Sequence, residues 1–333
     1  MMNARASLEM LSTVQKLAET GRHAAVLDRL GALPVQELEQ SPTLALLFGI
    51  AQARLGKHKS GRQWVTTALH TARARGDGAI EARALNVSGV IALEEGWIDE
   101  AESCFARALA AAERQGDRAT VGRCSNNVGI IANLRGQYGK AVGSYTMALA
   151  AFQQAGHRVG VAEALHNLAV SYQDQGDLAK ALETEERALK EATAAGDLAL
   201  VALVQGGRAQ IRLAMGETEL ARREIERALA MHREVGNVVG EAEDLRVLAG
   251  VLEQSSQLEE AEAMLRDVTA RATTLERPLL AAQARRDLSR LLHRQGREEE
   301  AQEAARRARD GFEKLGAVTE VERLEKFLAG FAS

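Results

Sequence analysis

Glycine recurs in this chain at intervals of forty residues, in two series that are offset by twenty. The first series comprises Gly56, Gly96, Gly136, Gly176, Gly216 and Gly296. The second comprises Gly76, Gly116, Gly156, Gly196, Gly236 and Gly316. Because glycine readily adopts the left-handed conformation that follows a helix, two glycines per period predict a repeated pair of short helices. One pair cannot bury its apolar face alone, so the pairs must stack into a solenoid.

Apolar residues follow helical spacing between successive glycines. In residues 163–175, Leu165, Leu168 and Tyr172 form one stripe at intervals of three and four residues. The following segment, residues 178–195, has a similar stripe made of Leu178, Ala181, Leu182, Ala188 and Leu189. Each repeat therefore contains a first helix, here called the A helix, and a second, the B helix.

Small residues occupy three columns when the repeats are aligned at forty residues. The first column is Gly49, Gly89, Gly129, Ala169, Ala209, Ala249 and Ser289. The second is Gly61, Ala101, Ala141, Ala181, Ala221, Ala261 and Ala301. The third is Ala68, Ala108, Ala148, Ala188, Ala228, Val268 and Ala308. Small side chains let helices approach closely, so the columns predict where neighbouring helices meet.

The three columns resemble the small-residue places of the tetratricopeptide repeat (TPR) family. That family commonly has a period of 34 residues, and the forty-residue version resembles kinesin light chain and the sensor arrays of bacterial maltose-type transcription activators. The resemblance implies an all-α fold, an α-solenoid that forms a right-handed superhelix of about eight helical hairpins plus a C-terminal capping helix. HEAT repeats are the alternative, but the sequence lacks their proline-kinked first helix and recurring Asp/Arg pair.

The repeats predict a single solenoid over residues 1–333. It would contain a short N-terminal repeat at 3–33, seven forty-residue repeats at 42–316 and a capping helix at 317–333, with Pro34 and Pro42 bracketing the first link. A capping box from Thr319 to Glu322 predicts the start of the last helix. Its apolar stripe consists of Val321, Leu324, Leu328 and Phe331. This stripe would cover the last layer or, alternatively, form a dimerisation or docking surface.

The fifth full repeat departs from the pattern by placing charge on its apolar stripe. Arg208 and Arg212 stand there, and Glu185 occupies an otherwise apolar or aromatic place in the preceding B helix. Because a B helix packs on the next A helix, we expect an ion pair between Glu185 and Arg208 or Arg212. The alternative is a rotated helix that sends both arginines to solvent.

Two further irregularities affect the same part of the chain. Gly206 and Gly207 lie inside a predicted helix, where each costs about 1 kcal/mol relative to alanine. They indicate a tolerated weak helix, or a bend or close approach of a ligand backbone. Ser256 and the segment 276–278 replace two turn glycines, which predicts a stretched turn between the sixth and seventh repeats.

The TPR resemblance implies that A helices line a concave binding face. The candidate partner-binding residues on it are Arg83, Asn86, Arg123, Asn126, Asn127, Asn133, His166, Asn167, Gln173 and Gln210. Asn127 and Asn167 match an asparagine with which family members hold a peptide backbone, and an amide can donate and accept at once. Arg83 and Arg123 add two guanidinium groups that suit a carboxylate. A basic inner strip continues through Arg246, Arg286 and Arg290, and the alternative is a merely solvated polar face.

Composition and motifs narrow the class of function. The net charge of −4 does not favour nucleic acid or anionic membranes as partners, and no apolar stretch reaches the length of a membrane span. The N-terminal segment lacks the apolar core of a signal peptide, and the high ratio of arginine to lysine is typical of bacterial coding. Cys104 and Cys124 are expected to be buried packing residues, and no catalytic or metal-binding motif occurs.

These observations predict a cytoplasmic, non-enzymatic scaffold or adaptor that needs no cofactor. Its partner would be another protein, of which an extended or helical and possibly acidic segment lies in the concave groove. The alternative is a regulatory sensor that binds a small peptide and controls a signalling or transcription partner. The chain would be a monomer, or a dimer through the C-terminal helix.

Overall fold

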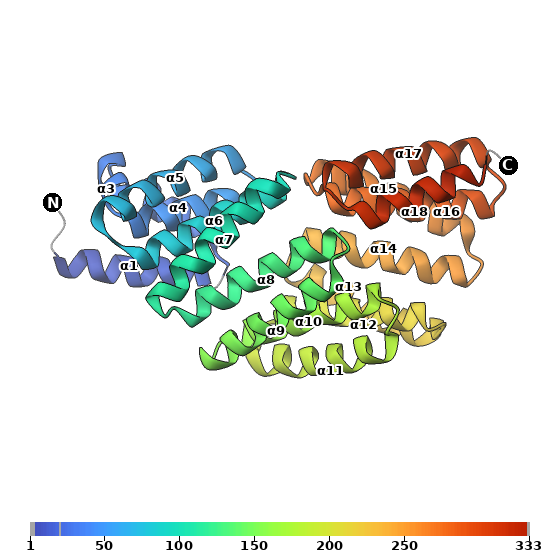
Figure 1. The fold of residues 1–333 in the computed structure, drawn as a ribbon, viewed down its shortest axis with the longest axis horizontal. Coiled ribbons are helices and arrows are strands. Elements are labelled where there is room, and N and C mark those ends of the chain that lie inside the picture. The colour runs from blue at the N-terminus through green and yellow to red at the C-terminus, as the bar shows by residue number, and fades with distance from the viewer. Residues whose placement is uncertain (1–3, 20, 332–333) are drawn as a thin grey trace. The chain divides into compact units, whose positions relative to one another are not determined.

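The computed structural model describes residues 4–19 and 21–331, and every regular element within them is an α-helix. The all-α prediction is therefore confirmed. The N-terminal helices are α1 (Ala4–Glu19), α2 (His23–Gly31), α3 (Val35–Gln40), α4 (Pro42–Arg54), α5 (His58–Arg75), α6 (Gly78–Glu94), α7 (Ile98–Gln115) and α8 (Arg118–Leu134) (Figure 1). The remaining helices are α9 (Tyr138–Gln154), α10 (Arg158–Asp174), α11 (Leu178–Ala195), α12 (Leu198–Ala214), α13 (Thr218–Glu234), α14 (Val238–Gln254), α15 (Leu258–Thr274), α16 (Pro278–Arg294), α17 (Glu298–Lys314) and α18 (Val318–Ala329).

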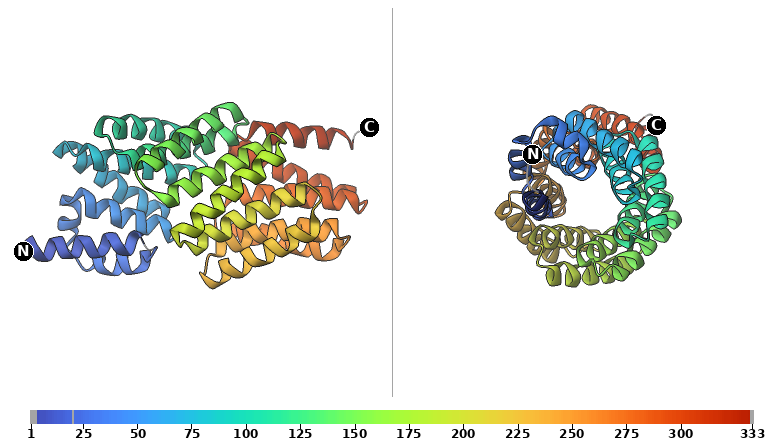
Figure 2. Two further views of the ribbon diagram at one scale, coloured as in Figure 1. Left: turned by 90° about the horizontal axis from the view of Figure 1, so that it is seen from below. Right: turned by 90° about the vertical axis from the view of Figure 1, so that its left-hand side faces the viewer.

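The helices form two compact units, Met1–Cys124 and Ser125–Ser333, which divide within α8. We call them unit 1 and unit 2. In each unit, consecutive helices pack as antiparallel hairpins, and each hairpin stacks on the next (Figure 2). The arrangement is that of a TPR-like solenoid. The prediction that one solenoid runs through both units stays a prediction. The expected link after residue 33 contains the short helix α3.

The glycine series mark the helix ends, as predicted. The glycines of both series have positive φ values, between 62° and 83°. Ser256 (φ 61°) and Glu276 (φ 52°) adopt the same conformation where glycine is missing. The predicted stretched turn between the sixth and seventh repeats is therefore wrong: α15 ends at Thr274 and α16 begins at Pro278, with the same turn as elsewhere. These two residues carry the backbone strain that glycine avoids.

The residue after each glycine of the second series, except Gly316, caps the next A helix. Asp77 and Asp197 each accept a hydrogen bond from the backbone N–H three residues later, at 3.0 Å. Asp117, His157 and Asn237 make the equivalent bond in the other repeats. Each cap satisfies a backbone donor that the helix leaves free and stabilises the helix by about 1 kcal/mol.

The first small-residue column leaves space for the large residues of the facing B helix. A Cβ atom on Gly89 would lie 2.5 Å from Cε1 of Phe105, and one on Gly129 would lie 2.5 Å from Cε1 of Tyr145. Phe105 and Tyr145 are both buried. Small residues in the A helix and large residues in the B helix are therefore complementary, which fixes how each hairpin closes.

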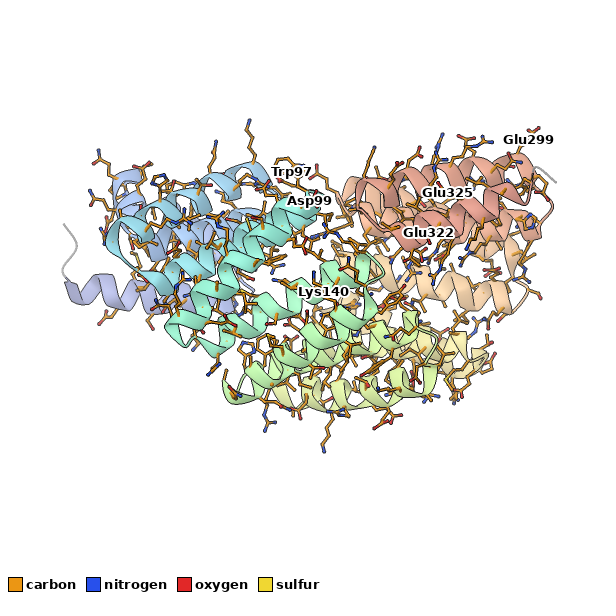
Figure 3. All side chains as sticks on the ribbon, in the orientation of Figure 1. Trp97, Asp99, Lys140, Glu299, Glu322 and Glu325 are labelled. Carbon is orange, nitrogen blue, oxygen red and sulfur yellow. The ribbon has the colours of Figure 1, made fainter. Side chains whose placement is uncertain are left out.

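The C-terminal helix α18 covers the last layer of unit 2 and also returns to its beginning. Leu324 is buried against α17, and Leu134 at the end of α8 packs in the same cluster. Thr319 lies against Gly136 in the turn that follows α8, and it hydrogen-bonds Tyr138. A cap was expected from the sequence, whereas this second contact was not. Glu322 and Glu325 on α18 and Lys140 on α9 are exposed (Figure 3).

The expected dimer through α18 stays a prediction. Parts of the apolar stripe of this helix are engaged within unit 2, because Phe331 packs edge to face on His293 and Phe327. None of the described helices is long and apolar enough to cross a membrane.

Candidate functional site

The A helices of unit 2 share a polar surface. These helices are α10, α12, α14 and α16 together with the end of α8, and each contacts the next along the series from α10 to α16. We call the surface that their side chains share the inner face. Its residues come from positions forty apart in the sequence, so one column of the repeat forms one row on the face.

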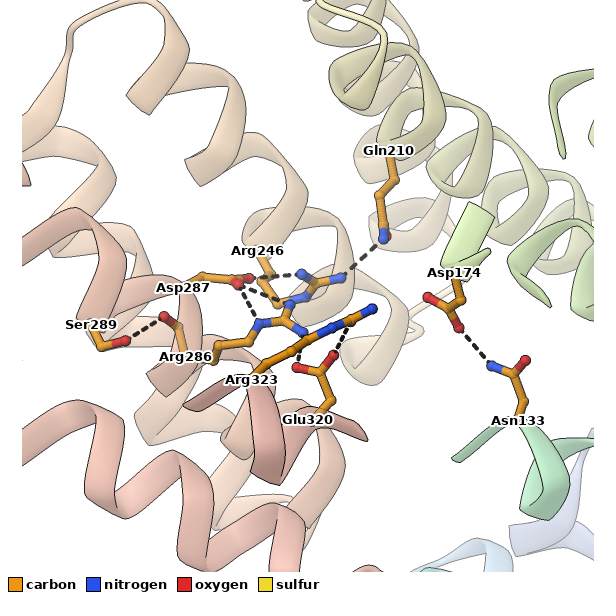
Figure 4. A network of polar contacts seen from close by, with 9 residues as sticks. All are labelled: Asn133, Asp174, Gln210, Arg246, Arg286, Asp287, Ser289, Glu320 and Arg323. Atoms are coloured by element: carbon orange, nitrogen blue, oxygen red, sulfur yellow. Dashed lines mark hydrogen bonds and ion pairs between the residues drawn. The ribbon is translucent and has the colours of Figure 1, made fainter. Parts of the chain in front are cut away.

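A chain of polar contacts crosses the inner face from α12 to α18 (Figure 4). Arg246 on α14 donates to Gln210 Oε1 at 3.2 Å and to Asp287 Oδ2 at 2.8 Å. Arg286 on α16 donates to Asp287 and, at 2.7 Å, to Glu320 on α18. Glu320 also accepts from Arg323 at 2.6 Å. Four helices are thus tied together by charge-assisted hydrogen bonds, which are stronger than neutral ones.

The charges of this network are stabilised in the folded state. Burial opposes ionisation of Asp287, but Arg286 and Arg246 together hold the pKa of its carboxyl below the ordinary value. Burial likewise disfavours the Arg286 guanidinium, yet Asp287 and Glu320 raise its pKa. Each buried charge therefore has opposite charges beside it, which is the condition under which such groups are tolerated.

A pocket of about 340 Å³ opens on the inner face beside this network. Its lining comes from α12, α14, α15 and α16 and comprises Gln210, Leu213, Arg246, Val247, Gly250, Glu253, Gln254, Leu265, Asp287, Arg290 and Arg294. Gly250 has no side chain, and Cδ2 of Leu213 fills the place beside it, 2.8 Å from where a Cβ atom would lie. The volume is at the lower end of the range for small-ligand sites.

The pocket carries one unbalanced positive charge. Arg246 pairs with Asp287, and Arg294 pairs with Glu253 at 2.7 Å. Arg290 forms no hydrogen bond or ion pair with any residue that the structure describes. Burial, followed by the nearby Arg286, lowers the pKa of Arg290, and this outweighs the attraction of Asp287 and Glu320, which raises it. Arg290 is exposed to solvent at the edge of the pocket.

Seven of the ten predicted binding residues lie in unit 2, and two of them bind each other. Asn167 donates to Asn126 Oδ1 at 3.0 Å. Asn133 accepts from Ser171 Oγ at 2.5 Å and donates to Asp174 Oδ2 at 2.7 Å. Asn126 is buried. Two sets of polar contacts therefore cross from α8 to α10, one between two amides and one from Asn133 to a hydroxyl and a carboxylate. The other four, Asn127, His166, Gln173 and Gln210, are half-buried on the A helices.

The other three predicted residues, Arg83, Asn86 and Arg123, belong to unit 1. Asn86 is buried, and its Oδ1 accepts a hydrogen bond from the thiol of Cys124 at 3.5 Å. Arg123 and Arg83 lie near enough to Asp117 to lower its pKa, although the hydrogen bonds from Thr120 lower it more. These residues thus form a local cluster at the start of α8.

Sequence reasoning found only one residue of the pocket among its candidate binding residues, Gln210. The signal that could have found the pocket is a column that changes character along the chain. It reads Val90, Ile130 and Val170 in three repeats and then Gln210, Gly250 and Arg290 in the next three. The aliphatic side chains of the first three repeats are thus followed by an amide, by no side chain and by a guanidinium. The predicted basic strip through Arg246, Arg286 and Arg290 lies on α14 and α16; Arg246 and Arg290 line the pocket, and Arg286 binds Asp287 beside it.

The predicted ion pair of Glu185 with Arg208 or Arg212 is wrong. Glu185 is fully buried, and its Oε1 lies 2.6 Å from His166 Nδ1 on the A helix of its own hairpin. Both arginines instead bind Glu224 on α13, at 2.9 Å and 3.2 Å. Each charge therefore finds its partner within its own hairpin. The alternative of two solvated arginines is also wrong, since both are largely buried.

The structure gives a physical reason for glycine at positions 206 and 207 that the sequence did not reveal. A Cβ atom on Gly207 would overlap Glu185 Oε1, and one on Gly206 would lie 2.7 Å from Asp244 Oδ1. Asp244 is buried and pairs with His232 at 2.7 Å. Two buried carboxylate–histidine pairs thus approach α12, and the glycines leave room for their carboxylates rather than for a ligand backbone.

The pKa values of His166 and His232 are raised above the ordinary value for histidine. Burial lowers the pKa of His166, but Glu185 outweighs it and raises the pKa overall. His232 shows the same balance with Asp244. Burial also raises the pKa of Glu185 and of Asp244 above the ordinary values. Each pair therefore retains a proton to higher pH than the separate side chains would in the unfolded chain.

The family model described as tetratricopeptide repeat matches residues 81–154, 120–194 and 200–274, which together are more than half of the chain. The chain belongs to the TPR family. A comparison with curated protein sequences returned no match.

Solved structures share the fold of this TPR protein over most of its length. A Rap protein complexed with Competence and Sporulation Factor superposes with a TM-score of 0.66 at 13% identity, covering 98% of both chains. The Rap conjugation gene regulator of plasmid pLS20, in complex with the Phr* peptide, gives 0.65 at 18% identity, covering 84% of this chain and 76% of that one. Aspartyl phosphate phosphatase F from Bacillus subtilis gives 0.66 at 12% identity, covering 93% and 85%. At these identities the likeness shows the fold alone, and the expectation of a non-enzymatic protein stays a prediction.

Proposed function

We propose that this TPR protein is a regulator that binds a short extended peptide on the inner face of unit 2 and thereby controls a partner protein. The observation that carries the proposal is the pocket with the unbalanced Arg290, placed on the same face as the Asn126–Asn167 pair. A charged pocket specifies one end of a ligand, whereas the amides can hold the backbone of an extended segment.

The likeness to solved structures supports a sensor over a static adaptor. Two of the Rap proteins that share the fold were solved with a bound factor or peptide, and one of them is described as a gene regulator. The match with the first of these extends over nearly the full length of both chains. A scaffold that holds a longer helical segment is the alternative, and it would need a groove longer than the pocket provides.

The amide pair offers a direct test of peptide binding. In the free protein Asn167 donates to Asn126, so a peptide carbonyl can replace Asn126 as acceptor without leaving a buried donor unsatisfied. Asn126→Ala with Asn167→Ala should therefore weaken binding of pentapeptides at least about tenfold. Affinity is measured by fluorescence polarisation with a labelled pentapeptide library.

The matched control is Gln153→Ala, an exposed amide near the end of α9. It should leave peptide affinity unchanged. If the double variant binds as tightly as the control, the Asn126–Asn167 pair is not part of the site. If only segments much longer than a pentapeptide bind, the scaffold alternative replaces the sensor.

A further inference from the structure

Six helices of unit 2 contact one another in a closed series. α10, α12, α14 and α16 are neighbours in that order. Side-chain contacts extend the series at both ends, since Asn167 on α10 binds Asn126 on α8, and Arg286 on α16 binds Glu320 on α18. The first turn of α18 contacts the turn after α8, so the last helix of the series meets the first. The inner face therefore lies within this closed series of helices.

The contact that closes the series is small and closely fitted. Thr319 lies so near Gly136 that a Cβ atom on the glycine would overlap its Oγ1, and Thr319 also hydrogen-bonds Tyr138. Leu134 packs against the cluster that contains Leu324. We call these contacts together the closing contact.

We propose that the closing contact is a gate, which separates to admit a ligand to the inner face and forms again around the bound ligand. The inference rests on the proposed function and adds the route by which the ligand enters and leaves. Entry along the axis of the series of helices, with the closing contact intact, is the competing route.

The closing contact can separate without unfolding a hairpin. Successive A helices of unit 2 are also joined through a B helix, as α11 packs on both α10 and α12. Gly136 and Thr319, by contrast, are joined in the chain only through all the repeats between them. A small change of curvature that is shared among the repeats therefore separates these two residues while each hairpin stays folded.

The charged side chains beside the closing contact keep their partners when it separates. On the side of α8, Asp174 accepts a hydrogen bond from Asn133 at 2.7 Å. On the side of α18, Glu320 accepts from Arg286 at 2.7 Å and from Arg323 at 2.6 Å (Figure 4). Depriving a buried charge of its partner is what makes such a separation costly. Here each carboxylate is satisfied on its own side, so the gate opens without that cost.

A disulfide across the closing contact tests whether the ligand passes through it. A Cβ atom on Gly136 would lie 3.3 Å from Cβ of Thr319, close to the spacing found in disulfides, so Gly136→Cys with Thr319→Cys should cross-link on oxidation. The probe is the labelled pentapeptide of the library that binds most tightly, and its association and dissociation rates are measured by stopped-flow fluorescence. Both rates should fall at least about tenfold in the oxidised chain, because the gate stays closed, and dithiothreitol should restore them. Peptide that is bound before oxidation should be trapped.

The converse variant is Gly136→Ala. Its methyl group overlaps Thr319 Oγ1, so the closing contact cannot form and both rates should rise. The matched control is Gly176→Ala: Gly176 also ends an A helix with a positive φ value, but a Cβ atom there meets nothing within 4 Å in the described part of the chain, so both rates should stay unchanged. The unaltered chain, oxidised and reduced in the same way, controls for the buried Cys104 and Cys124. Thermal unfolding of each variant checks that the fold is retained.

The outcomes separate the gate from the proposed function. Rates that neither the cross-link nor Gly136→Ala changes show that the ligand enters along the axis, which overturns the gate while the proposed function stands. Release of the peptide when its complex is oxidised shows that the bound state is open, which also overturns the gate. Failure of every pentapeptide to bind the unaltered chain refutes the proposed function, and the gate falls with it. As a measurement that needs no ligand, hydrogen exchange of the α18 amides should be faster in Gly136→Ala than in Gly176→Ala, and equal exchange would overturn the gate.

Discussion

The substitution Gly207→Ala tests whether a helix glycine is needed for a buried carboxylate. Alanine at an ordinary helix position stabilises by about 1 kcal/mol relative to glycine. In α12, however, the new methyl group would overlap Glu185 Oε1 and lie 3.0 Å from Cε1 of His166. The carboxylate ends a flexible side chain, but it is fully buried and bound to His166, so it has little room to move.

The two effects can be weighed against each other. Separating a buried charge from its partner costs about 3–5 kcal/mol. Subtracting the gain of about 1 kcal/mol in helix propensity leaves a net destabilisation of about 2–4 kcal/mol. The assay is urea denaturation followed by circular dichroism, with the free energy of unfolding compared with that of the unaltered chain.

Gly143→Ala in α9 is the matched control. This glycine is also inside a helix, but it is exposed and a Cβ atom there meets nothing within 4 Å, so alanine should stabilise by up to about 1 kcal/mol. In the background of Glu185→Ala, the Gly207→Ala change should be neutral or stabilising, because the overlapping oxygen is gone. The reasoning is refuted if Gly207→Ala is as stable as Gly143→Ala, or if the two positions show a coupling below about 0.5 kcal/mol.

The remaining predictions concern pH, turns and the end of the chain. Because the folded-state pKa values of His166 and His232 are raised above 6.5, their stabilisation is fully present below pH 6.5 and is lost as pH rises through the folded values. Urea midpoints should therefore fall between pH 6 and pH 9, and replacement of both histidines by glutamine should flatten this dependence. Ser256→Gly and Glu276→Gly should each stabilise by about 1 kcal/mol in the same assay, by relieving a positive φ value; a loss of stability would contradict the strain. Leu324→Ala should destabilise unit 2 by about 2–5 kcal/mol, because this buried leucine fixes α18, and unchanged thermal unfolding would show that α18 is dispensable.

The sequence predicted the helices well because the residues that end a helix lie next to it in the sequence. The glycine series predicted the helix ends, and even Ser256 and Glu276 obey the period, since the packing of the flanking helices imposes the turn where the residue type disfavours it. The partner of Glu185 could not be predicted in the same way. From its B helix the side chain can reach its own A helix or the next one, and only the side-chain packing around Gly207 decides for His166.

The pocket is harder still to predict, because it depends on side chains from three A helices at once. Gln210, Gly250 and Arg290 are forty residues apart. They shape the pocket because their side chains differ in length although they occupy one row of the inner face. The sequence did indicate the basic strip, but it could not show which arginines are neutralised. That depends on contacts such as Arg246 with Asp287, which join residues 41 apart.

The return of α18 to the turn after α8 changes the cooperativity expected of unit 2. In an open array each repeat interacts only with its neighbours, so unfolding can begin at either free end and spread inwards. Here the contact of Thr319 with Gly136 and Tyr138 makes the last helix a neighbour of the first in space. The contacts between neighbouring helices of unit 2 therefore form a closed series. A ligand that alters the spacing of the A helices must also strain the contact of Thr319 with Gly136 and Tyr138.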